Sequence, residues 1–266
     1  MRNKILVVLG PTATGKTDLA LQLAQQFAGE LVSADSRQVY KGLDIGTGKM
    51  PGFKLSIKRQ KGYWVMDGVK VWMYDMVSPD KQYTVADYVK GANRVIERIH
   101  KKSKLPIIVG GTGLYLKALL DGLESLSIPM DQKLRTELQI LDLKHLQERL
   151  QQLSKERWDQ LNDSDKKNTR RLVRAIELSI NENKRSIKSN QQRQDWDILK
   201  IGLTAPRESL YKNSDLRVLS WLRQGIIREV QNLMNKEIPF EKFLQLGLEY
   251  KIIAKYLNGQ IRQDEL

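Results

Sequence analysis

The distribution of apolar residues at the start of the chain predicts a strand, a helix and a second strand. Residues 5–9 form a continuous apolar run rich in β-branched side chains, which is typical of a strand buried on both faces. Apolar residues between positions 19 and 27 then fall on one helical stripe, and Gly29 stands where a helix C-cap belongs. Because residues 31–34 are again strand-like, we expect a βαβ unit with a right-handed crossover.

The same alternation returns between residues 85 and 120. Residues 85–99 carry apolar side chains at helical spacing, and residues 106–109 form another continuous apolar run. Residues 110–113, which read Gly-Gly-Thr-Gly, end that run, and residues 114–120 predict a further helix. Alternating helices and buried strands indicate the α/β class, with a parallel sheet covered by helices on both faces.

The pattern changes at about residue 121. From there to residue 195, leucine and isoleucine recur at helical spacing between charged residues, and strand-like runs are absent. Strand-like residues return at 198–203, where we expect the chain to rejoin the sheet, and helices should follow over 218–234 and 250–257. The polar stretch 181–194 predicts a loop or hairpin. We therefore expect a core of residues 1–120 and 196–266 and a helical insertion domain of residues 121–195.

Composition narrows the possible chemistry. The 266 residues include no cysteine and two histidines, which excludes thiol catalysis and cysteine-ligated metals and leaves little material for a serine–histidine–aspartate triad. No apolar run approaches the roughly 20 residues that a membrane span needs, and the first residues lack a signal-peptide pattern, so we expect a cytoplasmic protein with no membrane partner. A net charge of +14 favours a polyanionic partner, nucleic acid first, with a solvated basic surface as the alternative.

A phosphate-binding motif lies between the first predicted strand and its helix. It has the form G-x-x-x-x-G-K-[ST], and its residues are Gly10, Pro11, Thr12, Ala13, Thr14, Gly15, Lys16 and Thr17. In such a motif backbone N–H groups surround a phosphate at a helix N-terminus, the lysine reaches the outer phosphate oxygens, and the hydroxyl residue holds Mg²⁺. The sequence thus predicts a P-loop NTPase-like core that binds a di- or triphosphate, with Lys16 on the phosphate and Thr17 on the metal.

The carboxylate that P-loop ATPases usually carry after a later core strand is missing behind residues 106–109. Asp35 instead follows the second predicted strand, and Thr112 follows the third. Because ligands of parallel sheets bind outside the carboxyl ends of the strands, we expect Asp35, Thr112 and the phosphate motif to face one cleft. An isolated aspartate at such a position is equally consistent with a helix N-cap.

Several motifs along the chain, taken together, resemble those of the tRNA dimethylallyltransferase (tRNA isopentenyltransferase, IPP transferase) family. Beside the phosphate motif they are Ser33-Ala34-Asp35-Ser36 with Gln38-Val39-Tyr40, Asp44-Ile45-Gly46-Thr47, Ser78-Pro79 with Val85-Ala86-Asp87-Tyr88, Gly110-Gly111-Thr112-Gly113-Leu114-Tyr115-Leu116, and Arg170-Arg171-Leu172-Val173-Arg174-Ala175-Ile176-Glu177. The resemblance covers residues 4 to about 259. The chain also departs from the family pattern. Residues 71–75 read Val-Trp-Met-Tyr-Asp where the family commonly has His-His-Leu-Ile-Asp, and a longer, Lys-rich segment over residues 53–69 precedes them. Residues 248–251 read Leu-Glu-Tyr-Lys where the family usually has Ile-Gly-Tyr-Lys.

The resemblance implies a prenyl transfer. A dimethylallyl group would pass from dimethylallyl diphosphate to the exocyclic N6 amine of the adenosine 3′-adjacent to the anticodon in tRNA. Lys16 and a Mg²⁺ ion bound by Thr17 would stabilise the departing diphosphate. Asp35 is the candidate for the base that takes the proton of the amine, and Thr112 would align the amine or a phosphate oxygen. Lys16, Asp35 and Thr112 are therefore the catalytic candidates.

The resemblance also implies a surface that binds the tRNA anticodon stem-loop. Its residues would be Asp35, Ser36, Arg37, Gln38, Thr112, Arg135, Arg170, Arg171, Leu172, Val173 and Arg174. Residues 166–193 hold nine basic residues and two acidic ones. Such a charge run is often only a solvated helix face, but this one contains the family's basic helix motif. An adenine that leaves the anticodon-loop stack to react needs contacts of this kind to hold the RNA.

Three other functions stay open at this point. A P-loop small-molecule kinase would keep the fold but bind ATP. An isopentenyltransferase acting on free adenine nucleotides would have little use for the helical insertion. An RNA-binding protein without catalysis is the third. For the transferase we expect a monomer with Mg²⁺ as its cofactor.

Overall fold

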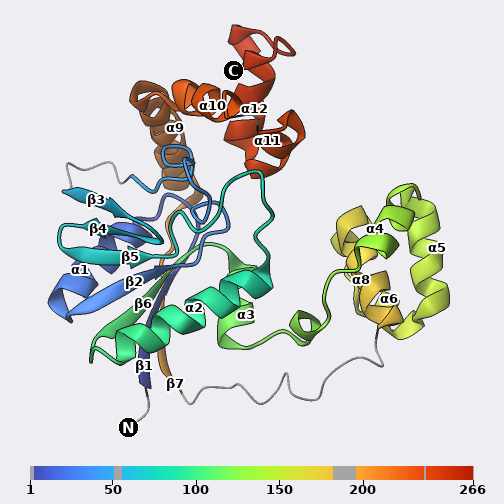
Figure 1. The fold of residues 1–266 in the computed structure, drawn as a ribbon, viewed down its shortest axis with the longest axis horizontal. Coiled ribbons are helices and arrows are strands. Elements are labelled where there is room, and N and C mark those ends of the chain that lie inside the picture. The colour runs from blue at the N-terminus through green and yellow to red at the C-terminus, as the bar shows by residue number, and fades with distance from the viewer. Residues whose placement is uncertain (1–2, 51–55, 182–195, 237, 266) are drawn as a thin grey trace. The chain divides into compact units, whose positions relative to one another are not determined.

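The computed structural model describes residues 3–50, 56–181, 196–236 and 238–265 (Figure 1). Over these residues the sheet has seven strands in the order β3-β4-β5-β2-β6-β1-β7. The strands are β1 (Asn3–Leu9), β2 (Gly29–Ser33), β3 (Ile57–Gln60), β4 (Tyr63–Met66), β5 (Val69–Trp72), β6 (Leu105–Gly110) and β7 (Trp196–Gly202). β5, β2, β6, β1 and β7 run parallel, and β3 and β4 add an antiparallel edge. The predicted α/β class is confirmed, and the pairing of β7 with β1 confirms that the chain rejoins the sheet.

Helices cover both faces of the sheet. The helices in the same part of the chain as the sheet are α1 (Lys16–Gln26), α2 (Val85–His100), α3 (Gly113–Leu120), α9 (Arg207–Gln224), α10 (Ile226–Met234), α11 (Phe240–Leu246), α12 (Leu248–Leu257) and the 3₁₀ helix η4 (Gln263–Glu265). Helix α1 packs with Leu6 and Val8 on one face, and α2 and α3 pack with Val7 and Ile108 on the other. Successive strand residues point to opposite faces, so a strand covered on both sides has a continuous apolar run.

The sequence pattern predicts that Gly29 is the C-cap of the first helix, but Gly29 lies in the strand that follows. The C-cap of α1 is Phe27, and Ala28 takes the left-handed conformation with φ 49°. Gly29 is the first residue of β2, where a Cβ would lie 2.9 Å from the carbonyl oxygen of Leu105 and from the Ile107 side chain. The close pairing of β2 with β6 therefore requires this glycine, and its assignment as a helix C-cap is wrong.

Strands β3 to β5 are not predicted by the hydrophobic pattern. The β3–β4 pair has the register Ile57↔Met66, and β4 pairs with β5 through Trp64↔Val71. Only alternate residues of β4, Trp64 and Met66, are buried, and β3 is exposed along most of its length. Because β3 is a polar edge strand, its sequence resembles that of a loop.

The C-terminal segment is helical as predicted, but its boundaries differ. The pattern predicts one helix over residues 218–234, whereas α9 and α10 meet at Gly225, whose φ of 92° interrupts the helix. Helix α11 is not predicted, because it is short. Helices α10 to α12 pack around Val230, Phe243 and Tyr250 and cover Leu43. No helix within the described ranges is long and apolar enough to span a membrane.

The chain forms two compact units. Unit 1 comprises residues 1–121 and 194–266, and unit 2 comprises residues 122–193. The helices of unit 2 are the 3₁₀ helix η1 (Glu124–Ser127), α4 (Gln132–Gln139), α5 (Leu143–Leu153), α6 (Lys155–Gln160), α7 (Asp163–Lys166) and α8 (Thr169–Ile180). Leu138, Leu150 and Ile176 form the centre of its apolar core and have no exposed surface. The predicted loop over residues 181–194 lies outside the described residues, except for Asn181, the C-cap of α8.

Candidate active site

A cleft with a volume of about 1280 Å³ lies in unit 1 where strands β1, β2 and β6 end. The segments that follow these strands, residues 10–18, 35–38 and 110–112, form much of its wall. Helix α9 contributes Asn213, Leu216, Arg217, Ser220, Trp221 and Gln224. The phosphate motif, Asp35 and Thr112 therefore line one cleft, as the order of strands in a parallel sheet predicts.

The phosphate motif forms a tight loop between β1 and α1. A Cβ on Gly10 would lie 2.3 Å from the carbonyl oxygen of Leu203, and Gly15, the N-cap of α1, has a φ of 79°. A larger residue at either position would be strained, and the bare backbone leaves N–H groups at the helix N-terminus able to bind an anion. The Lys16 ammonium donates a hydrogen bond to the Pro11 carbonyl, which holds the lysine along the loop.

Lys16 and Arg217 of α9 bring two positive charges to the cleft. Burial lowers the pKa of Lys16, the positive charge of Arg217 lowers it further, and the Asp35 carboxylate opposes both effects. Burial likewise lowers the pKa of Arg217, whose guanidinium lies 4.8 Å from the centre of the Trp221 ring. Two cations that are partly withdrawn from water favour a ligand with more than one negative charge, such as a diphosphate.

Asp35 lies in the turn that follows β2. Its Oδ1 accepts hydrogen bonds from the backbone N–H groups of Arg37 at 2.8 Å and Gln38 at 3.3 Å, so the capping role is present although a turn rather than a helix follows. Its Oδ2 has no hydrogen-bond partner among the described residues, and the half-buried side chain lines the cleft. One oxygen thus fixes the carboxylate, and the other is left for a ligand.

Thr112 connects the end of β6 to the same turn. Its Oγ1 accepts a hydrogen bond from the Ser36 N–H at 3.1 Å, and its own N–H donates to the Ala34 carbonyl at 3.2 Å. This approach needs Gly110, because a Cβ there would lie 2.3 Å from the Ala34 carbonyl oxygen. The threonine hydroxyl keeps its own proton for a further hydrogen bond. Thr112 and Asp35 are therefore held side by side through Ser36.

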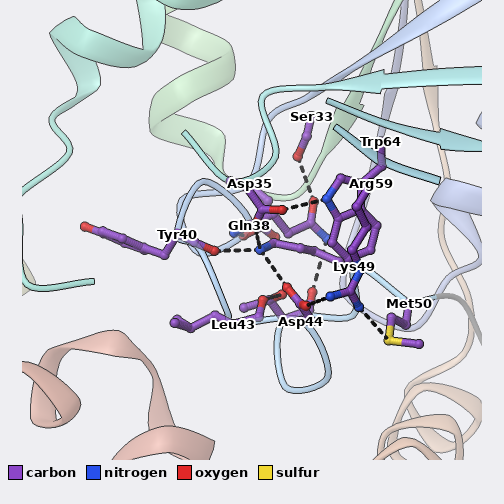
Figure 2. Close-up of polar contacts among 12 residues, drawn as sticks. Ser33, Asp35, Gln38, Tyr40, Leu43, Asp44, Lys49, Met50, Arg59 and Trp64 are labelled. Carbon is purple, nitrogen blue, oxygen red and sulfur yellow. Dashed lines mark hydrogen bonds and ion pairs between the residues drawn. The ribbon is translucent and has the colours of Figure 1, made fainter. Parts of the chain in front are cut away.

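Ser36, Arg37 and Gln38 also line the cleft. The side-chain amide of Gln38 is held at both ends: its Oε1 accepts a hydrogen bond from the Ser33 hydroxyl at 2.7 Å, and its Nε2 donates to the Thr47 carbonyl at 3.1 Å. Figure 2 shows Gln38 and Ser33 beside Asp35 in this network. The whole predicted segment 35–38 thus belongs to the cleft.

A carboxylate of α10 supports the loop on which Thr47 and Gly48 lie. Glu229 accepts hydrogen bonds from the N–H groups of Asp44 at 3.0 Å and Ile45 at 2.8 Å and from the Tyr250 hydroxyl at 2.7 Å. Burial raises the pKa of Glu229, and these three hydrogen bonds partly oppose the rise. The C-terminal helices therefore help to shape the cleft through a single half-buried carboxylate.

The surroundings of Thr17 fit a Mg²⁺ ion shared with a phosphate ligand. Thr17 and Asp18 line the cleft from the first turn of α1, and burial raises the pKa of Asp18. Across the described ranges there is no cluster of three or more acidic, histidine or cysteine side chains that could hold a metal by itself. Phosphate-bound Mg²⁺ takes only one or two protein ligands, its other ligands being phosphate oxygens and water. A hydroxyl at Thr17 matches that requirement.

Two of the predicted tRNA-binding arginines are part of the internal structure of unit 2. Arg135 donates through Nε and Nη2 to the two carboxylate oxygens of Glu177 at 2.7 and 2.9 Å, and Arg174 donates to the same carboxylate. Arg174 also donates to the carbonyls of Ser125 and Ile128 at 2.7 and 2.8 Å. Glu177 has no exposed surface, so the fold of unit 2 engages both guanidinium groups.

The other predicted residues of α8 differ in exposure. Arg170 and Arg171 are exposed, and Arg171 forms an ion pair with Asp165. Leu172 has no exposed surface, so its side chain belongs to the core of unit 2 and cannot contact RNA. Val173 packs against the same core. The basic residues between 182 and 193 lie outside the described residues. Arg170 and Arg171 are therefore the members of this set whose charge faces solvent.

Comparison with known proteins decides the family. Residues 38–266 match the family model described as IPP transferase, and residues 3–69 match isopentenyl transferase. The chain belongs to the IPP transferase family. The tRNA dimethylallyltransferase 2 of Treponema denticola is 39% identical, with 99% of this chain and 85% of the relative covered. The tRNA dimethylallyltransferase of Halothermothrix orenii is 36% identical, with 98% and 78% covered.

A solved structure supports the same assignment. The tRNA delta(2)-isopentenylpyrophosphate transferase of Staphylococcus epidermidis is 31% identical, with 99% of this chain and 83% of that chain covered, and superposes with a TM-score of 0.64. The resemblance based on short motifs is therefore confirmed over essentially the whole chain of this IPP transferase.

The sequence pattern does not reveal that Arg217 lines the cleft or that Glu229 supports its wall. Arg217 lies in α9 ahead of the predicted helix start, between Leu216 and Val218, and its position among apolar residues was the available signal. Glu229 binds a loop that is far from it in the sequence. No local motif marks such partners.

The Glu177 cluster leads to a prediction about stability. Burial acts to raise the pKa of Glu177, but hydrogen bonds from Arg135 and Arg174 outweigh it, and the pKa lies below the usual 4.5. We predict that Glu177→Gln lowers the free energy of unfolding of unit 2 by about 3 kcal/mol at neutral pH, because it breaks a buried ion cluster. An acid with a lowered folded pKa loses its stabilising effect as the pH falls through that pKa, so parent and variant should converge below pH 4.5.

Hydrogen exchange of peptides from α8 in the full chain measures this difference. Glu148→Gln is the matched control, since Glu148 is half-exposed and its nitrogen partner on Lys144 is 3.9 Å away. Equal protection of α8 in the parent and in Glu177→Gln at neutral pH would contradict the prediction.

Proposed function

We infer that the cleft of unit 1 is where this chain carries out the reaction of its family. The chain is a tRNA dimethylallyltransferase, which transfers a dimethylallyl group from dimethylallyl diphosphate to the N6 amine of the adenosine 3′-adjacent to the anticodon in tRNA. The observation that carries the location is that the phosphate motif and the carboxylate of Asp35 line the same cleft. A diphosphate-binding loop and a proton acceptor are thus available in one cleft to dimethylallyl diphosphate and the adenosine.

The phosphate loop forms the donor side of this cleft. Its backbone N–H groups, together with Lys16 and Arg217, place positive charge where the diphosphate gains negative charge as the allylic C–O bond breaks. The Thr17 hydroxyl would hold Mg²⁺, which adds to this stabilisation when bound. Strand β6 ends in Gly110 rather than in a carboxylate that could activate water. The absence of such a carboxylate suits this transfer, because activated water would hydrolyse the allylic donor.

Asp35 forms the acceptor side. The exocyclic amine of adenine is a weak nucleophile and must lose a proton as its nitrogen bonds to the allylic carbon. The proton passes to Oδ2 of Asp35, the diphosphate leaves with the electron pair of the C–O bond, and the numbers of atoms and charges balance. Oδ2 is suited to this role because Oδ1 is already held by two backbone N–H groups. The Thr112 hydroxyl can donate its proton to the amine or to a phosphate oxygen and so align them.

For the tRNA we propose two sets of contacts. Arg170 and Arg171 on α8 would bind phosphates of the anticodon stem-loop, and residues 35–38 would contact the reacting adenosine. Arg135 and Arg174 would act indirectly, by giving unit 2 its shape. We further propose that the chain acts as a monomer, because the phosphate motif, Asp35 and Thr112 come together within one chain.

The first prediction concerns the donor side. Lys16→Ala should lower the turnover number by roughly 10²–10³-fold, because the variant lacks a cation that stabilises the leaving diphosphate. The affinity for tRNA should stay the same, since Lys16 is assigned to the diphosphate. Steady-state kinetics with labelled dimethylallyl diphosphate and a filter-binding assay with tRNA measure the two quantities. Near-normal turnover in this variant would exclude the proposed diphosphate site.

The second prediction separates Asp35 from Thr112. Asp35→Asn keeps an oxygen that can accept the two backbone hydrogen bonds but removes the proton acceptor, so single-turnover transfer should fall roughly 10²–10⁴-fold. Thr112→Ala should reduce the rate less, because it removes one aligning hydrogen bond. If Asp35→Asn weakens tRNA binding and leaves the single-turnover rate intact, Asp35 positions the RNA and is not the base.

The third prediction concerns the exposed arginines of unit 2. Affinity for RNA falls as salt rises, and each neutralised phosphate of a single strand makes the plot of log affinity against log salt steeper by about 0.7. Arg170→Ala combined with Arg171→Ala should therefore make this plot for tRNA less steep by about 1.4. Affinity for dimethylallyl diphosphate should not change. The control removes two exposed lysines of the same unit, Lys133→Ala with Lys155→Ala. A slope equal to that of the parent would assign the arginines to a solvated helix face.

A further inference from the structure

The segment 34–50, here called the cleft loop, has almost no regular secondary structure. It follows β2 and carries Asp35, Gln38 and Thr47 into the cleft wall, yet its one strand-like feature is the bridge between Tyr40 and Val77. Turn hydrogen bonds within the loop and a few backbone hydrogen bonds to residues 75–77 satisfy part of its backbone, and side chains must supply further contacts. The side chains that bind the cleft loop therefore contribute to where Asp35 and Gln38 lie.

Lys49 is at the centre of these contacts (Figure 2). Its ammonium donates hydrogen bonds to the Tyr40 carbonyl at 2.6 Å, to Asp44 Oδ1 at 3.1 Å and to Asp75 Oδ1 at 2.6 Å. The Lys49 side chain has no exposed surface, and three acceptors match its three protons. Arg59 pairs with the second oxygen of Asp44 at 3.0 Å and balances the second carboxylate.

Asp75 links Lys49 to Gln38 from outside the cleft loop. While one of its oxygens binds Lys49, the other accepts a hydrogen bond from the Trp64 indole N–H at 2.6 Å. The backbone N–H of Asp75 donates to the Gln38 carbonyl at 3.3 Å. Asp75 has a φ of 55°, a conformation that costs free energy in a non-glycine residue and persists only where its contacts hold it. The ion pair with Lys49 is one of those contacts.

A second connection runs within the loop itself. Thr47, two residues before Lys49, accepts the hydrogen bond from the Gln38 amide at 3.1 Å and donates its own hydroxyl to the Leu43 carbonyl at 2.5 Å. Gln38 in turn gives its backbone N–H to Asp35 Oδ1. Both connections from Lys49 therefore converge on Gln38, and through it on the carboxylate that faces the cleft.

We propose that Lys49 is a positioning residue for the acceptor side of the cleft. It holds the cleft loop in the shape that presents Asp35 and Gln38 to the adenine, and it does so through other residues, since Lys49 is absent from the cleft wall. This inference rests on the role proposed above for Asp35. The three acceptors of the Lys49 ammonium lie outside the phosphate loop, which β1 and α1 build. Removal of Lys49 should therefore slow transfer and leave the binding of dimethylallyl diphosphate unchanged.

The test variant removes the ion pair without leaving an unpaired buried charge. Lys49→Met alone would strand the Asp75 carboxylate and destabilise the fold. Lys49→Met combined with Asp75→Asn removes both charges, and the asparagine oxygen can still accept the Trp64 hydrogen bond. Lys41→Met is the matched control, since Lys41 is an exposed lysine of the same loop.

Three measurements on the full chain decide the question: the melting temperature, the KM for dimethylallyl diphosphate, and the single-turnover rate with saturating tRNA. For the double variant we expect a folded protein, an unchanged KM and a rate roughly 10²-fold lower, the size of effect that a misplacement of about 1 Å produces. Lys41→Met should match the parent in all three. A general structural role would instead change the KM together with the rate.

A folded double variant that transfers at the parental rate, or that loses dimethylallyl diphosphate binding in parallel with the rate, would overturn the proposal. If the double variant does not fold, Asp75→Asn alone decides, because it weakens one connection and keeps Lys49 bound to Asp44. It should lower the rate with KM unchanged, and a parental rate would then overturn the proposal. Asp35→Asn tests the underlying role separately: a normal rate in that variant refutes the proposed base whatever the Lys49 variants do.

Discussion

The cleft depends on the close approach of backbone segments at the carboxyl edge of the sheet. At Gly10 and at Gly110 a Cβ would lie 2.3 Å from a carbonyl oxygen, that of Leu203 in the first case and that of Ala34 in the second. No other residue type fits at that separation, so the ends of β1, β7, β2 and β6 can meet only through glycine. The phosphate loop, the Asp35 turn and Thr112 are brought to one place by these contacts. The chemistry of the site follows from a steric constraint on the main chain.

Buried and half-buried charged side chains organise the segments that the sheet does not hold. Lys49 satisfies a carbonyl and two carboxylates around the cleft loop, and Glu229 satisfies two N–H groups of the same loop from α10. In unit 2, Glu177 joins α8 to α4 through Arg135, and Arg174 of α8 binds the same carboxylate. A fully paired buried charge contributes little net stability compared with an apolar core, but its removal is costly, so the geometry that it enforces is well defined.

Some arginines of this chain are bound by the protein itself and others are exposed, so net charge alone does not locate an RNA-binding surface. The basic helix motif contains Arg170, Arg171 and Arg174, yet the last of these is directed to Glu177 and to backbone carbonyls. A guanidinium that is saturated by the protein offers few donors to phosphate, whereas an exposed one can release condensed counterions from RNA. Arg217 is a third case, because α9 places it in the cleft near Lys16, where we propose that its charge acts on the donor.

The sequence by itself determined the features whose causes are local. The phosphate loop, the buried strands β1 and β6 and the amphipathic helix α2 follow from residues that are neighbours in the chain, and the ordered motifs identify the family. The edge strand β3 and the role of Gly29 depended on what each segment packs against. Only the tertiary structure decided that Lys49 binds Asp75, that Arg135 binds Glu177 and that Arg217 reaches the cleft. The physical reason is that a charged side chain has the same sequence signature whether it ends in water, in an ion pair or against a ligand, and its partner is set by long-range packing.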